Sequence, residues 1–321
     1  MIPKLNQSLI SDLQRFLGTG SLLEWIEAEC SRLACLGLSA GPCIRFTKKL
    51  LEEVQVREVT PNRSIRALAT IAPCAHGGGF KITLKPLLSK QDRRFWIAHE
   101  IAHTFWYRSG SNGLPLSEMQ SRYGSDSTIE WLCNRAAAAL LVPGLLLRND
   151  QNSCLAQLRA GQLHLIEKCA ADLEVPPRLL ARRLWHDLAS EHRAILAIEM
   201  SPARLPKAVV RWAALPDTIE RNIRHKMERK EVLPSALPQL SQAMSEDVNL
   251  PGEWRAFLFG CLFGVRAIPF KHCPPGVALP ARAGRLGLRT FLAVDLVEIE
   301  KSKASGRSGD KSGFRHGTSK R

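Results

Sequence analysis

The chain has 321 residues, enough for about two domains, and its 45 Lys and Arg against 30 Asp and Glu give a net charge of +15. Its 45% hydrophobic residues suffice for an ordinary core, which argues against wholesale disorder, and no apolar run reaches the roughly 18 residues of a membrane span. Nine cysteines without a Cys-x-x-Cys pair, together with a polar first segment, predict reduced thiols and a cytoplasmic protein with no membrane partner.

The positive charge is unevenly distributed along the chain. Residues 301–321 hold seven Lys and Arg and one Asp among many Ser and Gly, which predicts a disordered basic tail. The remaining charge includes a run over 221–230 and a cluster at Arg178, Arg182 and Arg183. We interpret these charges as solvated faces. The alternative is weak, salt-dependent contact with nucleic acid or with an acidic partner.

Apolar spacing in the first third of the chain predicts helices followed by a small β-sheet. The helices are expected over residues 4–34 and 44–54, and the strands over 55–59, 65–71 and 80–84.

Two further helices are expected after these strands. Ser89 and Asp92 form a capping box that should start a helix reaching about Tyr107. A Gly- and Ser-rich loop follows, and a second helix should run over about Ser127–Leu141 and be closed by Pro143.

The second half of the chain changes character at about residue 193. Residues 155–190 are expected to be all-helical and contain a helix, a short turn and a helix. Beyond 193, strand composition separated by polar, Pro-containing stretches predicts a second, smaller α+β domain. Its expected strands cover 194–198, 209–214, 266–270 and 286–299.

The sequence His99-Glu100-x-x-His103 lies in the middle of the first of these two later helices. Residues four apart on a helix share one face, so His99 and His103 can present two imidazoles to one metal ion. Glu100 follows the first ligand, where its carboxylate can take a proton from an attacking water. The surrounding helix is apolar nearly all round and should be buried, so these polar groups need partners. A metal is one solution, and a hydrogen-bonded pair of core histidines is the other.

A third ligand is expected from the second helix. Glu130 is the best candidate, and Asn134 lies one turn further on the same face, where it can accept a hydrogen bond from a ligating imidazole. The competing interpretation is local, because Ser127 and Glu130 also fit a capping box.

The two motifs together resemble the ImmA/IrrE family of zinc metallopeptidases. In that family the second motif has the form E-x-x-A-N-x-F-A-x-x-L-L-x-P, and here it closes with Leu140–Pro143. This chain departs from it at two packing positions, with Cys133 in place of Ala and Ala136 in place of Phe. The resemblance covers about residues 45–190.

The resemblance implies an α+β fold with a gluzincin-like metallopeptidase domain, in which a small sheet accompanies the active-site helix pair. The expected organisation is a zinc metallopeptidase domain over 1–150, a helical segment like a helix-turn-helix over 151–192, a small α+β domain over 193–300 with a GAF-like domain as the candidate that some family members suggest, and the tail over 301–321. It also implies a cytoplasmic protease that cleaves helix-turn-helix repressors of the XRE type. Such cleavage lifts repression of a mobile element or of a stress and DNA-damage response.

The implied mechanism assigns zinc to His99, His103 and Glu130, and proton transfer to Glu100. The oxyanion donor is left open among Tyr107, Tyr123 and His76, with Tyr123 as our choice for a second catalytic residue. The strand over 80–84 is expected to pair with an extended substrate.

Two other functions fit the same sequence. The first is a DNA-binding regulator, in which the arginines after Pro176-Pro177 contact phosphate. The second is a non-catalytic partner of a repressor, as in a toxin–antitoxin pair, which keeps the zinc fold as a scaffold. The complete HExxH motif argues against a dead site.

Overall fold

The computed structural model describes residues 6–38, 43–74, 78–107, 127–148, 154–160, 162–184, 193–200, 208–214, 231–232, 247–250, 279–286 and 289–295. These residues divide near position 190 into two compact units. The predicted tail and the basic run over 221–230 lie outside the described residues. Within the described stretches, no helix combines the length and apolarity that crossing a membrane requires.

The first unit begins with two helices where the sequence predicted one. Helix α1 (Gln7–Leu17) ends at Gly18, whose φ of 63° is the left-handed conformation that glycine adopts without strain. Helix α2 (Leu22–Gly37) then starts at Ser21, whose hydroxyl accepts a hydrogen bond from the Glu24 N–H. A glycine C-cap followed by a serine N-cap therefore interrupts a continuous apolar pattern.

The next helix, α3 (Lys48–Glu53), is shorter than the 44–54 predicted. Its start is fixed by Thr47, whose hydroxyl accepts from the Leu50 N–H and donates to the Leu36 carbonyl. The buried Ile44 lies before this cap, and its carbonyl accepts from Arg94 instead of continuing a helix.

A three-stranded sheet follows, made of β1 (Val56–Pro61), β2 (Ala69–Pro73) and β3 (Phe80–Leu84). The strand order is β1-β3-β2, with β3 parallel to β1 and antiparallel to β2. The prediction that β3 pairs with an extended substrate is therefore wrong, because both edges of β3 already carry a strand. Among the described strands, the open edges of this sheet belong to β1 and β2.

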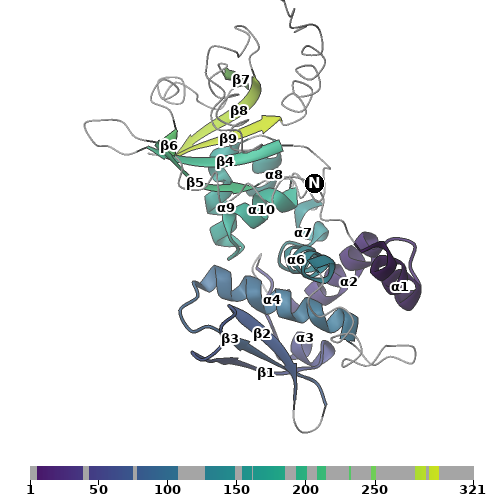
Figure 1. Ribbon diagram of the computed structural model, residues 1–321. Coiled ribbons are helices and arrows are strands. Elements are labelled where there is room, and N and C mark those ends of the chain that lie inside the picture. Colours follow the sequence, from purple (N-terminus) through teal and green to yellow (C-terminus); the bar gives the residue numbers. More distant parts are fainter. Residues whose placement is uncertain are drawn as a thin grey trace, which may run out of the picture. The chain divides into compact units, whose positions relative to one another are not determined.

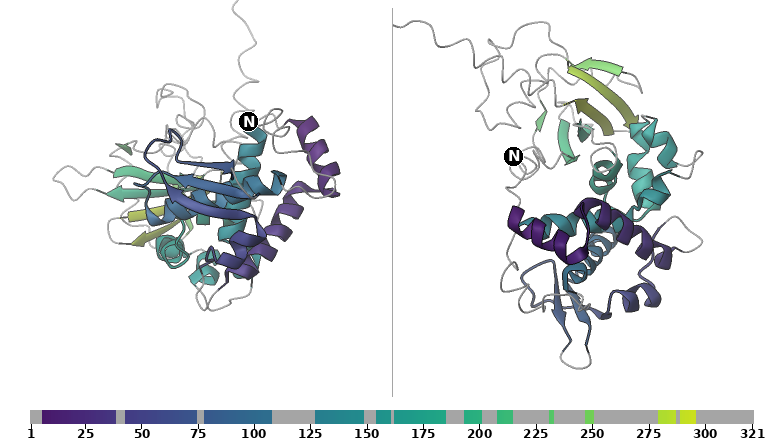
Figure 2. Two further views of the ribbon diagram at one scale, coloured as in Figure 1. Left: turned by 90° about the horizontal axis from the view of Figure 1, so that it is seen from below. Right: turned by 90° about the vertical axis from the view of Figure 1, so that its right-hand side faces the viewer.

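The two predicted later helices are confirmed, as α4 (Lys90–Tyr107) and α6 (Ser127–Leu141). The Ser89 hydroxyl accepts from the Asp92 N–H and donates to the Asp92 carboxylate, as the capping box predicted. Helix α4 packs against β2 and β3 on one side and against α6 on the other (Figure 1). Figure 2 shows the sheet spread across α4 from below. This sandwich accounts for the burial of nearly every residue of α4 beyond Ile97.

Short helices complete the first unit. They are α7 (Gly144–Arg148), α8 (Cys154–Arg159), the 3-10 helix η1 (Leu163–Leu165), α9 (Ile166–Asp172) and α10 (Pro177–Arg182).

One arginine of the predicted basic cluster is not on the surface. Arg183, directly after α10, is completely buried. Its Nε donates to the Val142 carbonyl at 2.9 Å, and its two terminal nitrogens engage the Glu27 carboxylate on α2. For Arg183 the predicted solvated face is therefore wrong, and so is the alternative of phosphate contact, because its charge is already neutralised inside the fold.

The cysteines also differ from the prediction. Cys154 and Cys169 form a disulfide between α8 and α9, so the expectation of reduced thiols is wrong for this pair. The other cysteines within the described residues are free thiols; they are Cys30, Cys35, Cys43, Cys74 and Cys133.

The second unit contains a six-stranded antiparallel sheet in the order β6-β5-β4-β9-β8-β7. Its strands are β4 (Arg193–Met200), β5 (Ala208–Ala214), β6 (Glu231–Val232), β7 (Asp247–Leu250), β8 (Leu279–Leu286) and β9 (Arg289–Asp295). The first and last of these strands in the chain, β4 and β9, pair at the centre. The predicted strand over 266–270 lies outside the described residues, and the GAF-like character of this unit stays a prediction. The molecule as a whole is α+β, as predicted.

Candidate metal centre

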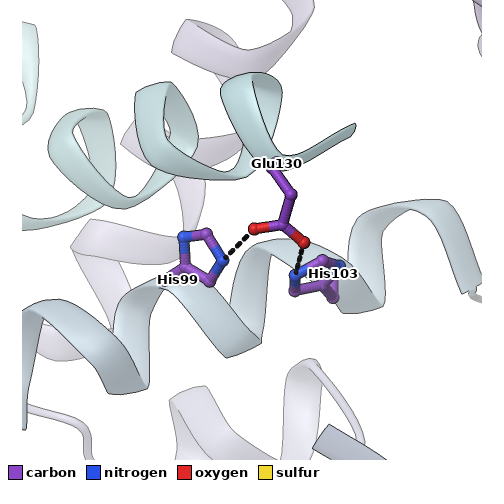
Figure 3. Close-up of side chains that lie close together, drawn as sticks. All are labelled: His99, His103 and Glu130. Atoms are coloured by element: carbon purple, nitrogen blue, oxygen red, sulfur yellow. Dashed lines mark ion pairs between the residues drawn. The ribbon is translucent and has the colours of Figure 1, made fainter. Parts of the chain in front are cut away.

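Helices α4 and α6 bring three potential metal ligands together. His99 and His103 project from one face of α4, and Glu130 reaches them from the first turn of α6 (Figure 3). The two carboxylate oxygens of Glu130 lie 3.2 Å from His99 Nε2 and 3.5 Å from His103 Nε2. The three ligand atoms all lie within 4.8 Å of one another. Two imidazoles and a carboxylate from two helices thus converge on one point.

The electrostatics of these groups suit a cation. Burial, reinforced by the neighbouring His99, lowers the pKa of His103 to about 4, although Glu130 opposes this shift. The contact with the His99 ring lowers the pKa of Glu130, although burial opposes this shift. At neutral pH His103 therefore offers a neutral ring nitrogen and Glu130 an ionised oxygen. These are the protonation states that metal coordination requires.

Asn134 lies against the outer nitrogen of His99. Its side-chain oxygen is 3.2 Å from His99 Nδ1. An amide oxygen accepts, so this contact favours the tautomer in which Nδ1 carries the proton and Nε2 keeps its lone pair for a metal. The contact also fixes the ring orientation. The sequence placed Asn134 one turn after Glu130, and the helix delivers both side chains to the same histidine.

Glu100 is the buried carboxylate of the site. Only 5% of the residue is exposed, and burial raises the pKa of its carboxyl to about 7; the Glu130 charge adds to this rise and His99 opposes it. A carboxyl with a pKa near the working pH can both take up and release a proton during a reaction. In α4 it follows His99 directly, in the same helical turn as the two candidate ligands.

Aromatic packing fixes the two helices behind the site. The Trp106 indole N–H donates to Cys133 Sγ at 3.3 Å, linking α4 to α6. Trp25 from α2 packs edge-on against Phe105, with ring centroids 5.9 Å apart, and lies 6.0 Å from Trp106. The cysteine at this family packing position thus makes a specific contact, which sequence pattern alone does not reveal.

A charged contact that sequence reasoning missed anchors the start of α4. Glu174, in the turn between α9 and α10, accepts from Lys90 Nζ at 2.7 Å and lies 3.4 Å from Arg94 and from Arg45. Arg94 is itself buried and donates to the backbone carbonyls of Ile44 and Glu174. Glu174 has a positive φ of 55°, whereas the sequence predicted only a short turn at this position. The turn of the helical segment is thereby tied to the helix that carries the histidines.

The three candidate oxyanion donors are not among the side chains that the structure describes. Tyr123 and His76 lie outside the described residues, as does the side chain of Tyr107. The catalytic role of Tyr123 stays a prediction.

Comparison with known proteins agrees with this arrangement. A family model of the peptidase M78 group, described as the IrrE N-terminal-like domain, matches residues 76–184. A search of curated proteins finds no match. The matched residues contain both motifs and also the helices α8 to α10, so the helical segment falls within the same family domain. Residues 76–184 therefore match an IrrE N-terminal-like domain of the peptidase M78 group, which supports the ImmA/IrrE resemblance of the two motifs.

Proposed function

We propose that this protein is a zinc-dependent endopeptidase that cleaves a helix-turn-helix repressor. The observation that carries the proposal is the convergence of His99, His103 and Glu130 on one point, beside the buried carboxylate of Glu100. A metallopeptidase domain is given by the family. The metal's identity, the cleavage and the substrate are what we add.

The ligand set favours zinc. Two imidazole nitrogens and one carboxylate oxygen are a typical protein ligand set for catalytic zinc, which leaves a coordination position open for the reaction. A hydrogen-bonded pair of core histidines accounts less well for the same contacts, because Glu130 is half exposed and comes from another helix to meet both rings.

Each residue then has a definite task. His99, His103 and Glu130 would hold the metal, whose positive charge would polarise the scissile carbonyl and acidify the attacking water. Glu100 takes the proton from that water on a carboxylate oxygen and passes it to the leaving amine nitrogen as the C–N bond breaks. Asn134 keeps His99 in the tautomer that frees Nε2.

The substrate segment is proposed to lie along β2. This strand packs beside α4, is paired only with β3 among the described strands, and presents its other backbone edge. An extended peptide can add to such an edge through main-chain hydrogen bonds, which position a peptide bond without demanding a particular sequence.

The repressor and the biological setting come from the family resemblance. On this basis the protein acts in the cytoplasm and relieves repression of a mobile element or of a stress or DNA-damage response.

The test uses the full chain and a purified helix-turn-helix repressor of the XRE type. The two proteins are incubated as purified, with a chelator, and with the chelator followed by one equivalent of zinc, and the products are measured by mass spectrometry. We expect discrete repressor fragments that disappear with chelator and return with zinc. An intact repressor in all three samples would contradict the proposal that the repressor is the substrate. Fragments that form equally with chelator would contradict the proposal that cleavage requires a metal.

Adding operator DNA to the same mixture distinguishes a peptidase from the alternative of a DNA-binding regulator. A regulator would shift operator DNA in a gel without cutting the repressor. The burial of Arg183 removes one of the three arginines on which that alternative rests, and Glu174 keeps the turn before α10 attached to α4. We therefore favour the peptidase.

A further inference from the structure

The disulfide between Cys154 and Cys169 is unusual for this chain. Five other cysteines within the described residues are free, and three of them, Cys30, Cys43 and Cys133, are buried thiols that serve as core residues. A protein that depended on disulfides for its fold would be expected to pair more of them. In the cytoplasm, where we propose above that this protein acts, a single bridge among free thiols of the described residues is typical of a pair that responds to redox conditions.

The two sulfurs differ in accessibility. Cys169 is 1% exposed, whereas Cys154, the first residue of α8, is half-buried. Cys154 is therefore the more exposed side of the bridge, and we expect an external thiol to attack its Sγ, with Cys169 as the leaving group.

The disulfide lies in the segment that is attached to the metal-site helices. Cys169 is in α9, and five residues later Glu174 binds Lys90 and Arg94 of α4. After α10, Arg183 binds the Val142 carbonyl just beyond α6 and the Glu27 carboxylate of α2. The bridge ties α8 to α9 immediately before these two attachment points.

We propose that Cys154–Cys169 is a thiol-exchangeable disulfide whose oxidised form stabilises α9 and α10 against the metal-site helices. Reduction begins when the thiolate of a small external thiol attacks Cys154 Sγ, the S–S bond breaks, and Cys169 leaves with the electron pair and takes up a proton. A second external thiolate attacks the external sulfur of the mixed disulfide, and Cys154 leaves with the electron pair and takes up a proton. The two external thiols are thereby joined in a disulfide of their own. Two electrons pass from two small thiols of the glutathione class, and their oxidised form reverses the process.

The experiment equilibrates the full chain in buffers of reduced and oxidised glutathione, traps free thiols with iodoacetamide, and identifies them by peptide mass. We expect Cys154 and Cys169 to become alkylated together, in one two-electron transition. Alkylation of both in the fully oxidised buffer, or of neither in the fully reduced buffer, would overturn the proposal.

Amide hydrogen exchange on the same samples measures the structural consequence. Removing a bridge that closes a loop of about 15 residues should raise exchange in α9 and α10 at least about tenfold. The variant C154S/C169S should exchange like the reduced protein in both buffers. The control C35S removes an exposed free thiol on α2 and should follow the wild type. Equal exchange in oxidised and reduced wild type would overturn the proposal without any substitution, and neither readout depends on peptidase activity.

Discussion

The helix pair α4–α6 and the helical segment from α8 to α10 both bury charged or titratable side chains, but they satisfy them differently. In α4 and α6, His99, His103 and Glu130 turn their polar atoms toward one another around a common point. In the helical segment, Arg183 is fully paired with Glu27 and a backbone carbonyl. Polar groups that converge on a shared point suit a ligand, whereas groups that saturate one another serve attachment. The predictions below test this contrast.

The largest effect is expected from the attachment site. Glu27→Gln leaves the buried Arg183 guanidinium without its counter-charge and should reduce the free energy of unfolding by about 3–4 kcal/mol. Urea unfolding measures this loss. Arg15→Met is the matched control, because that arginine is 81% exposed in its pair with Asp12 and should change stability by less than about 0.5 kcal/mol. Similar losses in the two variants would show that Arg183 does not anchor the segment.

The next effect belongs to the metal site and has the opposite sign. The pKa of Glu100 in the fold, about 7, lies above the ordinary 4.5, so protonation stabilises the metal-free protein. This stability is complete below pH 4.5 and is lost as the pH rises through 7. In the presence of chelator, the free energy of unfolding of Glu100→Gln should therefore exceed that of the wild type by about 3 kcal/mol at pH 8. At pH 4.5 the two proteins should be about equally stable. Urea unfolding at both pH values measures it, with the exposed Glu24→Gln as control. An equal stability of variant and wild type at pH 8 would mean that Glu100 is not held in a desolvated position.

A smaller change is expected when the support of a ligand is removed. Asn134→Ala deletes the acceptor beside His99 Nδ1 and should weaken zinc binding about 10–100-fold. Competition with a chromogenic chelator at fixed pH gives the affinity. Asn134→Asp retains an oxygen acceptor and should restore most of it. Unchanged affinity in the alanine variant would mean that the contact does not orient the ring.

The smallest effect is expected at the turn between α9 and α10. Lys90 and Arg45 are mostly exposed where they meet Glu174. The buried Arg94 also loses a counter-charge in Glu174→Gln, but it keeps its hydrogen bonds to the backbone carbonyls of Ile44 and Glu174. The substitution should therefore cost only about 1 kcal/mol at low salt. This difference in stability should shrink in 1 M NaCl, because the Debye length there is only about 3 Å and exposed charges are screened. A loss as large as that of Glu27→Gln would remove the distinction between the two attachment points.

The grouping of His99, His103 and Glu130 was largely predictable because helical geometry constrains it. A spacing of four places His99 and His103 on one face, and the same spacing places Glu130 and Asn134 together on the partner helix. The capping box of Ser89 and Asp92 likewise marks the start of α4, and Pro143 marks the end of α6, from local sequence. These features depend on neighbours a few residues away, which a single sequence contains.

The features that were missed depend on residues far apart in the chain. Arg183 and Glu27 are separated by 156 positions, and nothing near either one indicates that the arginine is buried. The position of β3 between β1 and β2 depends on strand order, which alternating residues do not specify. The Cys154–Cys169 pair was missed because spacing does not determine which cysteines meet.

The central claim is that Glu100 acts as the base at a metal held by His99, His103 and Glu130. It is tested most directly by measuring zinc content and repressor cleavage in the same preparations of wild type and Glu100→Gln. We expect one zinc per chain in both proteins, fragments with the wild type, and a cleavage rate in the variant lower by about 10³-fold or more. A variant that retains zinc and still cuts the repressor at the wild-type rate would contradict the account.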